Sequence, residues 1–241
     1  VVCRRQRQMC IRDRAQSGYD RIFGHSSPYN MGALFSYNGT PRFYDDGGYI
    51  AGNTIQTKTW THFAVTYDGS KTVLYQNGVN VAEETSPDFS GTDDISIGDT
   101  TYELYGYVSD FRTSNTVVYS SNFTPPTAPL SSTGSIIHIK CTDAHVLDKS
   151  QTFNLELKGN TASTAALTAS SSPPRIGAAW DNTSAVVFDG NGDYIPIISN
   201  FFYDMQIANK LTTKFTIETW AYQTGRSSST GYTHLFDSII G

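Results

Sequence analysis

Three oxygen-bearing side chains at alternate positions form the first pattern that could do chemistry. They are Asp189, Asn191 and Asp193, in the segment Asp-Gly-Asn-Gly-Asp. On a β-strand this spacing would place all three on one face, where a glycosidase needs its pair of carboxylates. The central residue is an amide, however, and the alternating glycines favour a turn. We therefore expect no glycosidase centre in this segment.

The same segment also begins like a calcium loop, because oxygen ligands recur at every second residue. An EF-hand needs Gly at its sixth position and Glu at its twelfth, where this sequence has Tyr194 and Asn200. Two interpretations stay open. One is a tight turn between strands; the other is a Ca²⁺ site whose ligands are Asp189, Asn191 and Asp193.

Other catalytic motifs are absent from the sequence. It has no Gly-x-Ser-x-Gly, His-Glu-x-x-His or Gly-x-x-x-x-Gly-Lys pattern. The five histidines are scattered, and His62 lies beside Trp60 on an expected strand, where a structural role fits best. We predict that the protein is not an enzyme.

Tyrosines next to amides and carboxylates offer a different chemistry, the binding of a glycan. Sugar recognition needs an exposed aromatic surface flanked by groups that hydrogen-bond hydroxyls. An alternative is that these tyrosines only cover the rim of the fold. The predicted ligand-binding residues are Tyr37, Asn38, Tyr44, Asp45, Asp46, Tyr49 and Asn53.

The segment from Trp60 to Val81 indicates the scaffold. It reads as three strands joined by an Asp-Gly and an Asn-Gly turn. A two-residue type I′ turn at Asn77-Gly78 would set Leu74 opposite Val81. That pair would enter a core, while Tyr75 and Asn80 would meet solvent or a ligand.

Similar alternation predicts strands along the rest of the chain, and no helix of convincing length appears. Trp60 and Trp220 lie in strands of apolar alternation, which favours core packing for both. Residues 185–188 and 194–198 suggest a hairpin. The other expected strands are 19–24, 31–37, 41–44, 136–140, 153–157, 215–222 and 235–240.

Composition agrees with an all-β protein. Charged residues make up 16% of the chain and aromatic residues 13%, with 20 glycines, a profile that suits a sandwich with many turns. No apolar run reaches the roughly 18 residues of a membrane helix, so no membrane partner is expected.

Residues 1–14 differ from the rest of the chain. They contain five arginines and one acidic residue, which leaves 12 basic and 21 acidic residues elsewhere. This leader resembles translated sequencing-adapter sequence or a disordered tail, and we exclude it from fold reasoning. The acidic remainder argues against a nucleic-acid partner. Without the leader Cys141 is the only cysteine, so no disulfide framework is expected.

A family resemblance rests on the longest strand-rich segments. Trp60-Thr-His-Phe-Ala-Val-Thr-Tyr-Asp-Gly69 and Gly106-Tyr-Val-Ser-Asp-Phe-Arg112 resemble the back half of a laminin G-like (LamG) domain of the concanavalin A-like lectin/glucanase superfamily. Val187–Tyr194 and Phe215–Trp220 resemble its front half. The resemblance implies an antiparallel β-sandwich with a concanavalin A-like jelly roll.

The order of these halves suggests two tandem repeats. Domain 1 would span residues 15–123 without its front strands, a linker rich in Pro, Ser and Thr would span 124–135, and a truncated domain 2 would span 136–241. Either half alone would leave open sheet edges. We therefore hypothesise one composite sandwich, in which the front half of the second repeat docks onto the back half of the first. Residues 131–180 would then supply a connector and satellite strands.

One further resemblance suggests a biological setting. Val118–Leu130 is similar to the tail that follows such domains in structural proteins of marine tailed phages. It implies a non-catalytic module of a virion tail or surface structure, whose partners are a cell-surface glycan and neighbouring repeats of the same chain. Two alternatives remain: a secreted, extracellular bacterial adhesin or appendage of a polysaccharide-degrading enzyme, and a purely structural virion domain without a ligand.

Overall fold

The computed structural model describes the parts of the chain that carry most of the expected strands. Residues 1–14 and the expected strands at 153–157 and 235–240 lie outside the described part. The described residues are 19–23, 32–45, 47–89, 95–98, 104–127, 130–141, 146–148, 162–164, 185–189, 193–197, 206–207, 210–211, 214–223 and 232–233.

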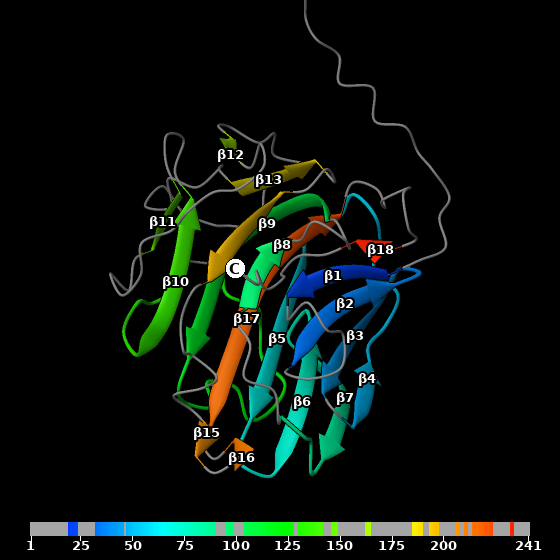
Figure 1. Cartoon of the computed structure of the whole chain (residues 1–241), viewed down its shortest axis with the longest axis vertical. Coiled ribbons are helices and arrows are strands. Elements are labelled where there is room, and N and C mark those ends of the chain that lie inside the picture. Colours follow the sequence, from blue (N-terminus) through cyan, green and yellow to red (C-terminus); the bar gives the residue numbers. More distant parts are fainter. Residues whose placement is uncertain are drawn as a thin grey trace, which may run out of the picture.

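Two antiparallel sheets make up most of the described structure (Figure 1), which contains strands and no helix. The smaller sheet has the order β18-β1-β2-β3-β4, with a short parallel pairing between β18 and β1. Its strands are β1 (Tyr19–Phe23), β2 (Ala33–Tyr37), β3 (Thr40–Asp45), β4 (Gly48–Ala51) and β18 (Tyr232–Thr233).

The larger sheet has the order β11-β10-β9-β17-β5-β6-β7, with β13 also pairing with β9 and β12 with β13. Its strands are β5 (Thr61–Tyr67), β6 (Lys71–Gln76), β7 (Val79–Thr85), β9 (Tyr105–Ser114), β10 (Ser135–Cys141), β11 (Val146–Asp148), β12 (Ala162–Thr164), β13 (Ala185–Asp189) and β17 (Phe215–Gln223). Separate pairs are formed by β8 (Ile95–Gly98) with β14 (Tyr194–Ile197), and by β15 (Gln206–Ile207) with β16 (Lys210–Leu211).

The main core lies between the two sheets. Because side chains alternate along a strand, each sheet turns one apolar row inward. Leu34 and Phe43 of the smaller sheet share a cluster with Phe63, Val65 and Ile217 of the larger one, all nearly inaccessible to solvent. This arrangement confirms the predicted all-β, antiparallel sandwich.

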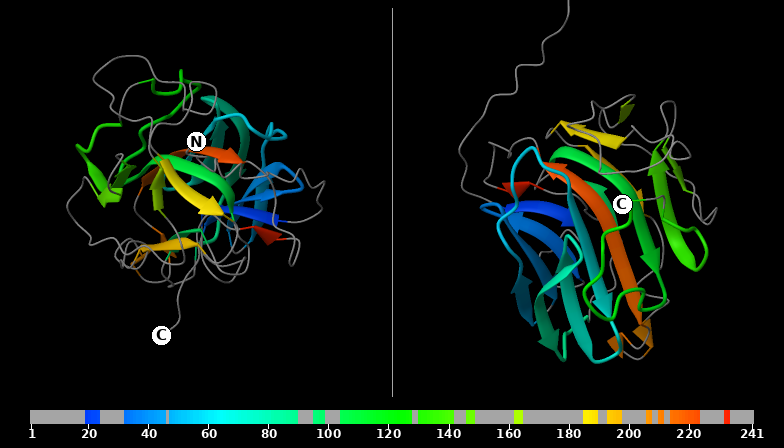
Figure 2. Two further views of the ribbon diagram at one scale, coloured as in Figure 1. Left: turned by 90° about the horizontal axis from the view of Figure 1, so that it is seen from above. Right: turned by 180° about the vertical axis from the view of Figure 1, so that it is seen from behind.

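Strand β17 lies within the larger sheet, as the hypothesis of a composite sandwich requires; its origin in a second repeat stays a prediction. It hydrogen-bonds on one side to β5 and on the other to β9, although it follows both by about a hundred residues or more in sequence. Figure 1 and the right-hand view of Figure 2 show β17, in orange, between β5 and β9. The approach is close, since a Cβ on Gly106 of β9 would lie 2.0 Å from the Tyr222 carbonyl oxygen of β17.

Two local predictions are wrong. The expected hairpin of residues 185–198 does not form, because β13 pairs with β9 and β12 while β14 pairs with β8. β13 and β14 thereby pair with the earlier strands β9 and β8. The main-chain N–H and C=O groups of β9 and β8 would otherwise need other hydrogen-bond partners. Leu74 lies opposite Ala82 and not Val81, because the register shifts between Leu74 and Tyr75.

A segment without regular structure crosses the outer face of the larger sheet. We call residues 116–123 the strap. Its two ends are tied to different strands: Val118 N donates to Thr216 Oγ1 of β17 at 2.8 Å, and Phe123 N donates to the Gly78 carbonyl of the β6–β7 turn, also at 2.8 Å. The strap thus connects β17, which we call the inserted strand, to the β6–β7 hairpin at the edge of the larger sheet.

Within the described residues, no helix is long and apolar enough to cross a membrane.

Candidate functional site

The predicted ligand-binding residues lie in and around β2, β3 and β4, and some of them are buried. Tyr44 is 5% exposed; its ring packs edge-on against Phe35, with ring centres 5.1 Å apart, and at a tilt against Tyr49, with ring centres 5.0 Å apart. The Asp45 carboxylate accepts hydrogen bonds from the backbone N–H groups of Gly47, Gly48 and Asp88. Asp45 therefore fixes the β3–β4 turn. The neighbouring predicted residue, Asp46, lies outside the described residues.

Tyr37 and Tyr49 come together around a residue that the sequence analysis did not select. The Arg42 guanidinium carbon lies 4.2 Å from the centre of the Tyr37 ring and 4.4 Å from that of Tyr49. Period-two alternation from Tyr44 puts Arg42 on the same face of β3, so this signal could have identified it.

The two predicted asparagines border this group. Asn38 is exposed in the β2–β3 turn and has a positive φ of 51°. Asn53 is exposed two residues after β4, where its backbone N–H donates to Gln76 Oε1 at 2.9 Å. Their role in ligand binding stays a prediction.

The predicted calcium ligands are only partly described. Asp193 is buried just before β14, Asp189 ends β13 opposite Tyr105, and Asn191 lies outside the described residues. The part of the chain that the structure describes contains no group of three His, Cys, Asp or Glu side chains that could hold a metal. The calcium site stays a prediction.

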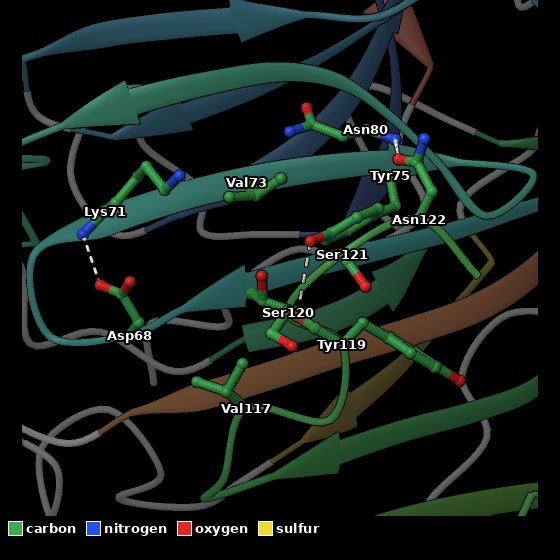
Figure 3. A pocket seen from close by; sticks show the side chains of 11 residues that line it. Asp68, Lys71, Val73, Tyr75, Asn80, Val117, Tyr119, Ser120, Ser121 and Asn122 are labelled. Atoms are coloured by element: carbon green, nitrogen blue, oxygen red, sulfur yellow. Dashed lines mark hydrogen bonds between the residues drawn. The ribbon is translucent and has the colours of Figure 1, made fainter.

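A pocket of about 500 Å³ lies between the strap and the outer face of strands β5, β6 and β7. In Figure 3, Val117, Tyr119 and Ser120 of the strap lie on one side of it and Lys71 and Val73 of β6 on the other, while Asn122 of the strap lies beside Asn80. Hydroxyl, amide and charged groups dominate its lining, with valines between them. The lining residues are Thr66, Asp68, Lys71, Val73, Tyr75, Asn80, Val117, Tyr119, Ser120, Ser121 and Asn122.

Strap contacts hold this pocket in shape. The Asn122 Oδ1 accepts from the Asn80 backbone N–H at 2.8 Å, and the Tyr75 hydroxyl reaches the Tyr119 carbonyl at 3.5 Å. Tyr119 and Phe123 stack with ring centres 3.6 Å apart and pack over Tyr75. The alternation along β6 predicts that Tyr75 meets solvent or a ligand; the strap leaves it 2% exposed and on the pocket wall.

The two charged groups that line the pocket have polar partners within the protein. Asp68 accepts two backbone N–H groups, from Lys71 and Ser70, and these hydrogen bonds lower the pKa of its carboxyl group. The Lys71 ammonium lies 3.1 Å from Glu83. Each charged group therefore has a partner of its own, and the pocket offers mainly neutral hydrogen-bonding groups to a ligand.

A buried ionic network between β9 and β17 is hydrogen-bonded to the strap. Arg112 of β9 donates to the Glu218 carboxylate of β17 through Nε at 2.6 Å and also through Nη2. Tyr119 of the strap donates its hydroxyl to the same carboxylate at 2.6 Å, and His62 Nε2 lies 3.4 Å from it. Burial alone would raise the pKa of Glu218, but His62, Arg112 and Tyr119 together hold the pKa below its ordinary value.

A second polar chain fixes the segment that follows the strap. His138 of β10 lies 2.8 Å from Asp110 through Nε2 and 2.9 Å from Ser132 through Nδ1. Asp110 has a positive φ of 59° where the β9 register is irregular, and its carboxylate also accepts from the Leu130 N–H. This arrangement ties residues 130–132 to the sheet. Its members are scattered along the sequence, so no sequence motif predicts it.

Glu218 has the chemical identity of a glycosidase carboxylate but not the environment of one. A general acid needs a raised pKa and an open approach to substrate. The pKa of Glu218 is lowered, the side chain is buried, and the strap covers it. Trp60 and Trp220 are buried as predicted, in a small cluster with Ala185 and Tyr222.

One family model matches part of the chain. Residues 10–122 match the family model described as the concanavalin A-like lectin/glucanases superfamily, of the laminin G type. The matched segment includes β1 to β9 and most of the strap, and strand β17 lies beyond it. Comparison with curated proteins and with solved structures gave no match.

Proposed function

We propose that this chain is a non-catalytic glycan-binding module and that a neutral sugar occupies the strap pocket. A laminin G-like, concanavalin A-like sandwich is a fold that displays ligand sites on a rigid scaffold, so function must be argued from the site itself. The observation that carries the proposal is a pocket of about 500 Å³ lined by hydroxyl and amide groups whose charged members are already paired.

The lining fits a sugar better than it fits an apolar or an anionic ligand. Ser120, Ser121 and the amides of Asn80 and Asn122 can exchange hydrogen bonds with hydroxyl groups. Val73 and Val117 offer apolar contacts to the C–H faces of a sugar ring. Small-ligand sites commonly combine such apolar walls with a few placed polar groups.

The proposal is tested by isothermal titration of neutral oligosaccharides into the whole chain. Tyr75→Phe removes a hydroxyl from the pocket wall, and Ser121→Ala removes one from the strap. Each should weaken binding about fivefold to tenfold, the effect of one lost hydrogen bond. Tyr107→Phe is the matched control, because Tyr107 packs against Trp60 and Tyr222 and not at the pocket. Equal affinities for the three variants would refute the assignment of the pocket.

The biological setting belongs to the same proposal. The resemblance of Val118–Leu130 to phage structural proteins supports a virion module that binds a glycan on the host cell surface, next to further repeats. Sequencing of the flanking genes tests this setting. Tail and baseplate genes would support it, whereas a signal peptide and polysaccharide-degradation genes would favour the secreted adhesin.

A further inference from the structure

The β6–β7 turn contains a dipeptide, Asn77-Gly78, that is chemically labile in water. A main-chain nitrogen can attack the side-chain amide of the asparagine before it, and glycine, which has no Cβ, hinders that attack least. The sequence has three such Asn-Gly pairs, at 38–39, 77–78 and 191–192. The pair at 77–78 is hydrogen-bonded to the strap through the Gly78 carbonyl.

The reaction converts the Asn77 amide to a carboxylate and can change the path of the main chain. The Gly78 nitrogen loses its proton and bonds to Asn77 Cγ, the Cγ–Nδ2 bond breaks, and ammonia leaves a five-membered succinimide. Water then opens the ring. Addition of water at Cγ gives aspartate, whereas addition at the Asn77 main-chain carbonyl gives isoaspartate, in which the chain runs through Cβ and Cγ.

The folded turn holds Asn77 in a conformation that opposes ring closure. Its backbone N–H donates to the His62 carbonyl at 2.8 Å, and its Oδ1 accepts from the His62 N–H at 2.9 Å. Asn77 and Gly78 have φ values of +51° and +77°, as in a type I′ turn. Such a turn places the second nitrogen nearly opposite to the Cβ of the first residue, whereas the succinimide ring needs both on the same side.

The strap restrains the rotation that ring closure requires. Phe123 N donates to the Gly78 carbonyl at 2.8 Å, and the Phe123 carbonyl lies so close to buried Gly78 that no side chain fits there. Next to this contact, Asn122 Oδ1 accepts from the Asn80 N–H (Figure 3). Reorienting the Asn77-Gly78 peptide also moves the Gly78 carbonyl, so the strap must be displaced first.

We propose that Asn77 is a modification site that the strap protects. Asn77 deamidates when the strap is displaced, and isoaspartate at this position then prevents the strap from docking again. Slow chemistry in a locally opened state proceeds in proportion to the population of that state. The stability of the strap contact therefore sets the rate of modification. This inference does not depend on the sugar proposed for the strap pocket.

The two products should differ in their effect on the turn. Isoaspartate lengthens the main chain of a two-residue turn in which Gln76 pairs with Val79, so the Gly78 carbonyl no longer meets Phe123 N. Aspartate keeps the normal main chain, and its carboxylate can still accept from the backbone N–H that Asn77 Oδ1 binds. Only the isoaspartate product should release the strap.

The test follows deamidation of the whole chain at mildly alkaline pH by peptide mapping with mass spectrometry. Asn122→Ala removes the acceptor of the Asn80 N–H near one end of the strap, and Thr216→Val removes the acceptor of the Val118 N–H at the other. Each should raise the rate at Asn77 at least about fivefold, the effect of one lost hydrogen bond on the population of the displaced strap.

Two controls separate displacement of the strap from a general loss of stability. Asn38-Gly39 has φ values of +51° and +79° in the β2–β3 turn of the other sheet, and its rate should be the same in wild type and strap variants. Thr219→Val removes a buried hydrogen bond to the Ser109 carbonyl. Thr219 lies on the face of β17 opposite to the strap, so this variant should leave the rate at Asn77 unchanged.

A second measurement tests the effect of the modification on the strap. Hydrogen exchange of the Phe123 amide is compared between aged protein that contains isoaspartate at position 77 and Asn77→Asp. The variant carries the same added charge on a normal main chain. The Phe123 amide should exchange at least about tenfold faster in the aged protein, and at the wild-type rate in Asn77→Asp.

Several results would overturn the proposal. They are an unchanged rate at Asn77 in both strap variants, an equal acceleration at Asn38, and an equal acceleration by Thr219→Val. A wild-type rate at Asn77 as high as that in concentrated urea would show that the strap gives no protection. Unchanged exchange of the Phe123 amide in the isoaspartate form would refute the effect on the strap.

Discussion

One added carbon atom, the Cβ of an alanine at position 78, can break the contact between the strap and the β6–β7 turn. Gly78 has a φ of +77°, and a Cβ built there would lie 1.9 Å from the Phe123 carbonyl oxygen and 2.9 Å from its carbon. Real Cβ atoms do not approach backbone so closely, so Gly78→Ala must displace the strap. The hydrogen bond from Phe123 N to the Gly78 carbonyl would be lost with it.

The size of the effect follows from two contributions. A left-handed backbone costs an L-residue about 1–2 kcal/mol, and a lost hydrogen bond adds about 1 kcal/mol. Gly69→Ala is the matched control: Gly69 also has a positive φ, +99°, in a neighbouring hairpin turn, but nothing lies within 4 Å of its Cβ position. The control should show the backbone cost alone.

Urea unfolding, followed by tryptophan fluorescence, measures the difference. Gly78→Ala should be less stable than Gly69→Ala by about 1 kcal/mol or more, which corresponds to a further drop of about 2–4 °C in melting temperature for a domain of this size. Gly78→Ala should also lose binding of neutral oligosaccharide, since the strap forms one wall of the pocket. Equal stabilities for the two variants would refute the strap contact.

Three further predictions concern the inserted strand and the ionic network. Gly106→Ala should disrupt the β9–β17 pairing and lower the unfolding midpoint, whereas Gly48→Ala, with nothing near its Cβ position, should change it little; amide hydrogen exchange of β17 checks this. The lowered pKa of Glu218 gives stability that is present above the ordinary Glu pKa of about 4.3 and is lost as pH falls through the folded value. Glu218→Gln should therefore lower stability at pH 7 and flatten its acid dependence below about pH 5, and an unchanged acid slope in urea titrations would contradict this. Burial and the Glu218 charge raise the pKa of Tyr119, so its contribution is present below the ordinary Tyr pKa of about 10 and is lost as pH rises beyond it. Tyr119→Phe should reduce the loss of stability between about pH 9 and 11, measured against the wild type by the same titration.

Local patterns in the sequence predicted most strands, because alternation and turn residues act over a few positions. Asn77 and Gly78 both have positive φ values in the turn they were expected to form. The predicted hairpin at 185–198 does not form, because a turn signal indicates only that two strands are close in sequence. It does not indicate which sheet edges are available for pairing. β13 and β14 each pair with a strand of the first half of the chain.

The candidate sites were harder to predict, because they depend on contacts between distant segments. Nothing in the residues of the strap shows a period, so its path over Tyr75 could not be read from the sequence. The ligand surface at Tyr37 and Tyr49 was expected, but Arg42 was overlooked because it is adjacent to neither tyrosine in sequence. Arg42 pairs with Phe35 on β2 and Ala51 on β4, so it reaches the two tyrosines diagonally across the strands.

The ionic network links the assembly of the sandwich to the strap pocket. Glu218 comes from the inserted strand, Arg112 from the strand beside it, and Tyr119 from the strap. A buried carboxylate without partners would be strongly destabilising, so these groups must assemble together. Because β17 also anchors the strap through Thr216, the pocket has its described shape only when the inserted strand is in place. A ligand that binds only the assembled pocket must therefore stabilise the docking of β17, by an amount that grows with the ratio of free ligand concentration to Kd.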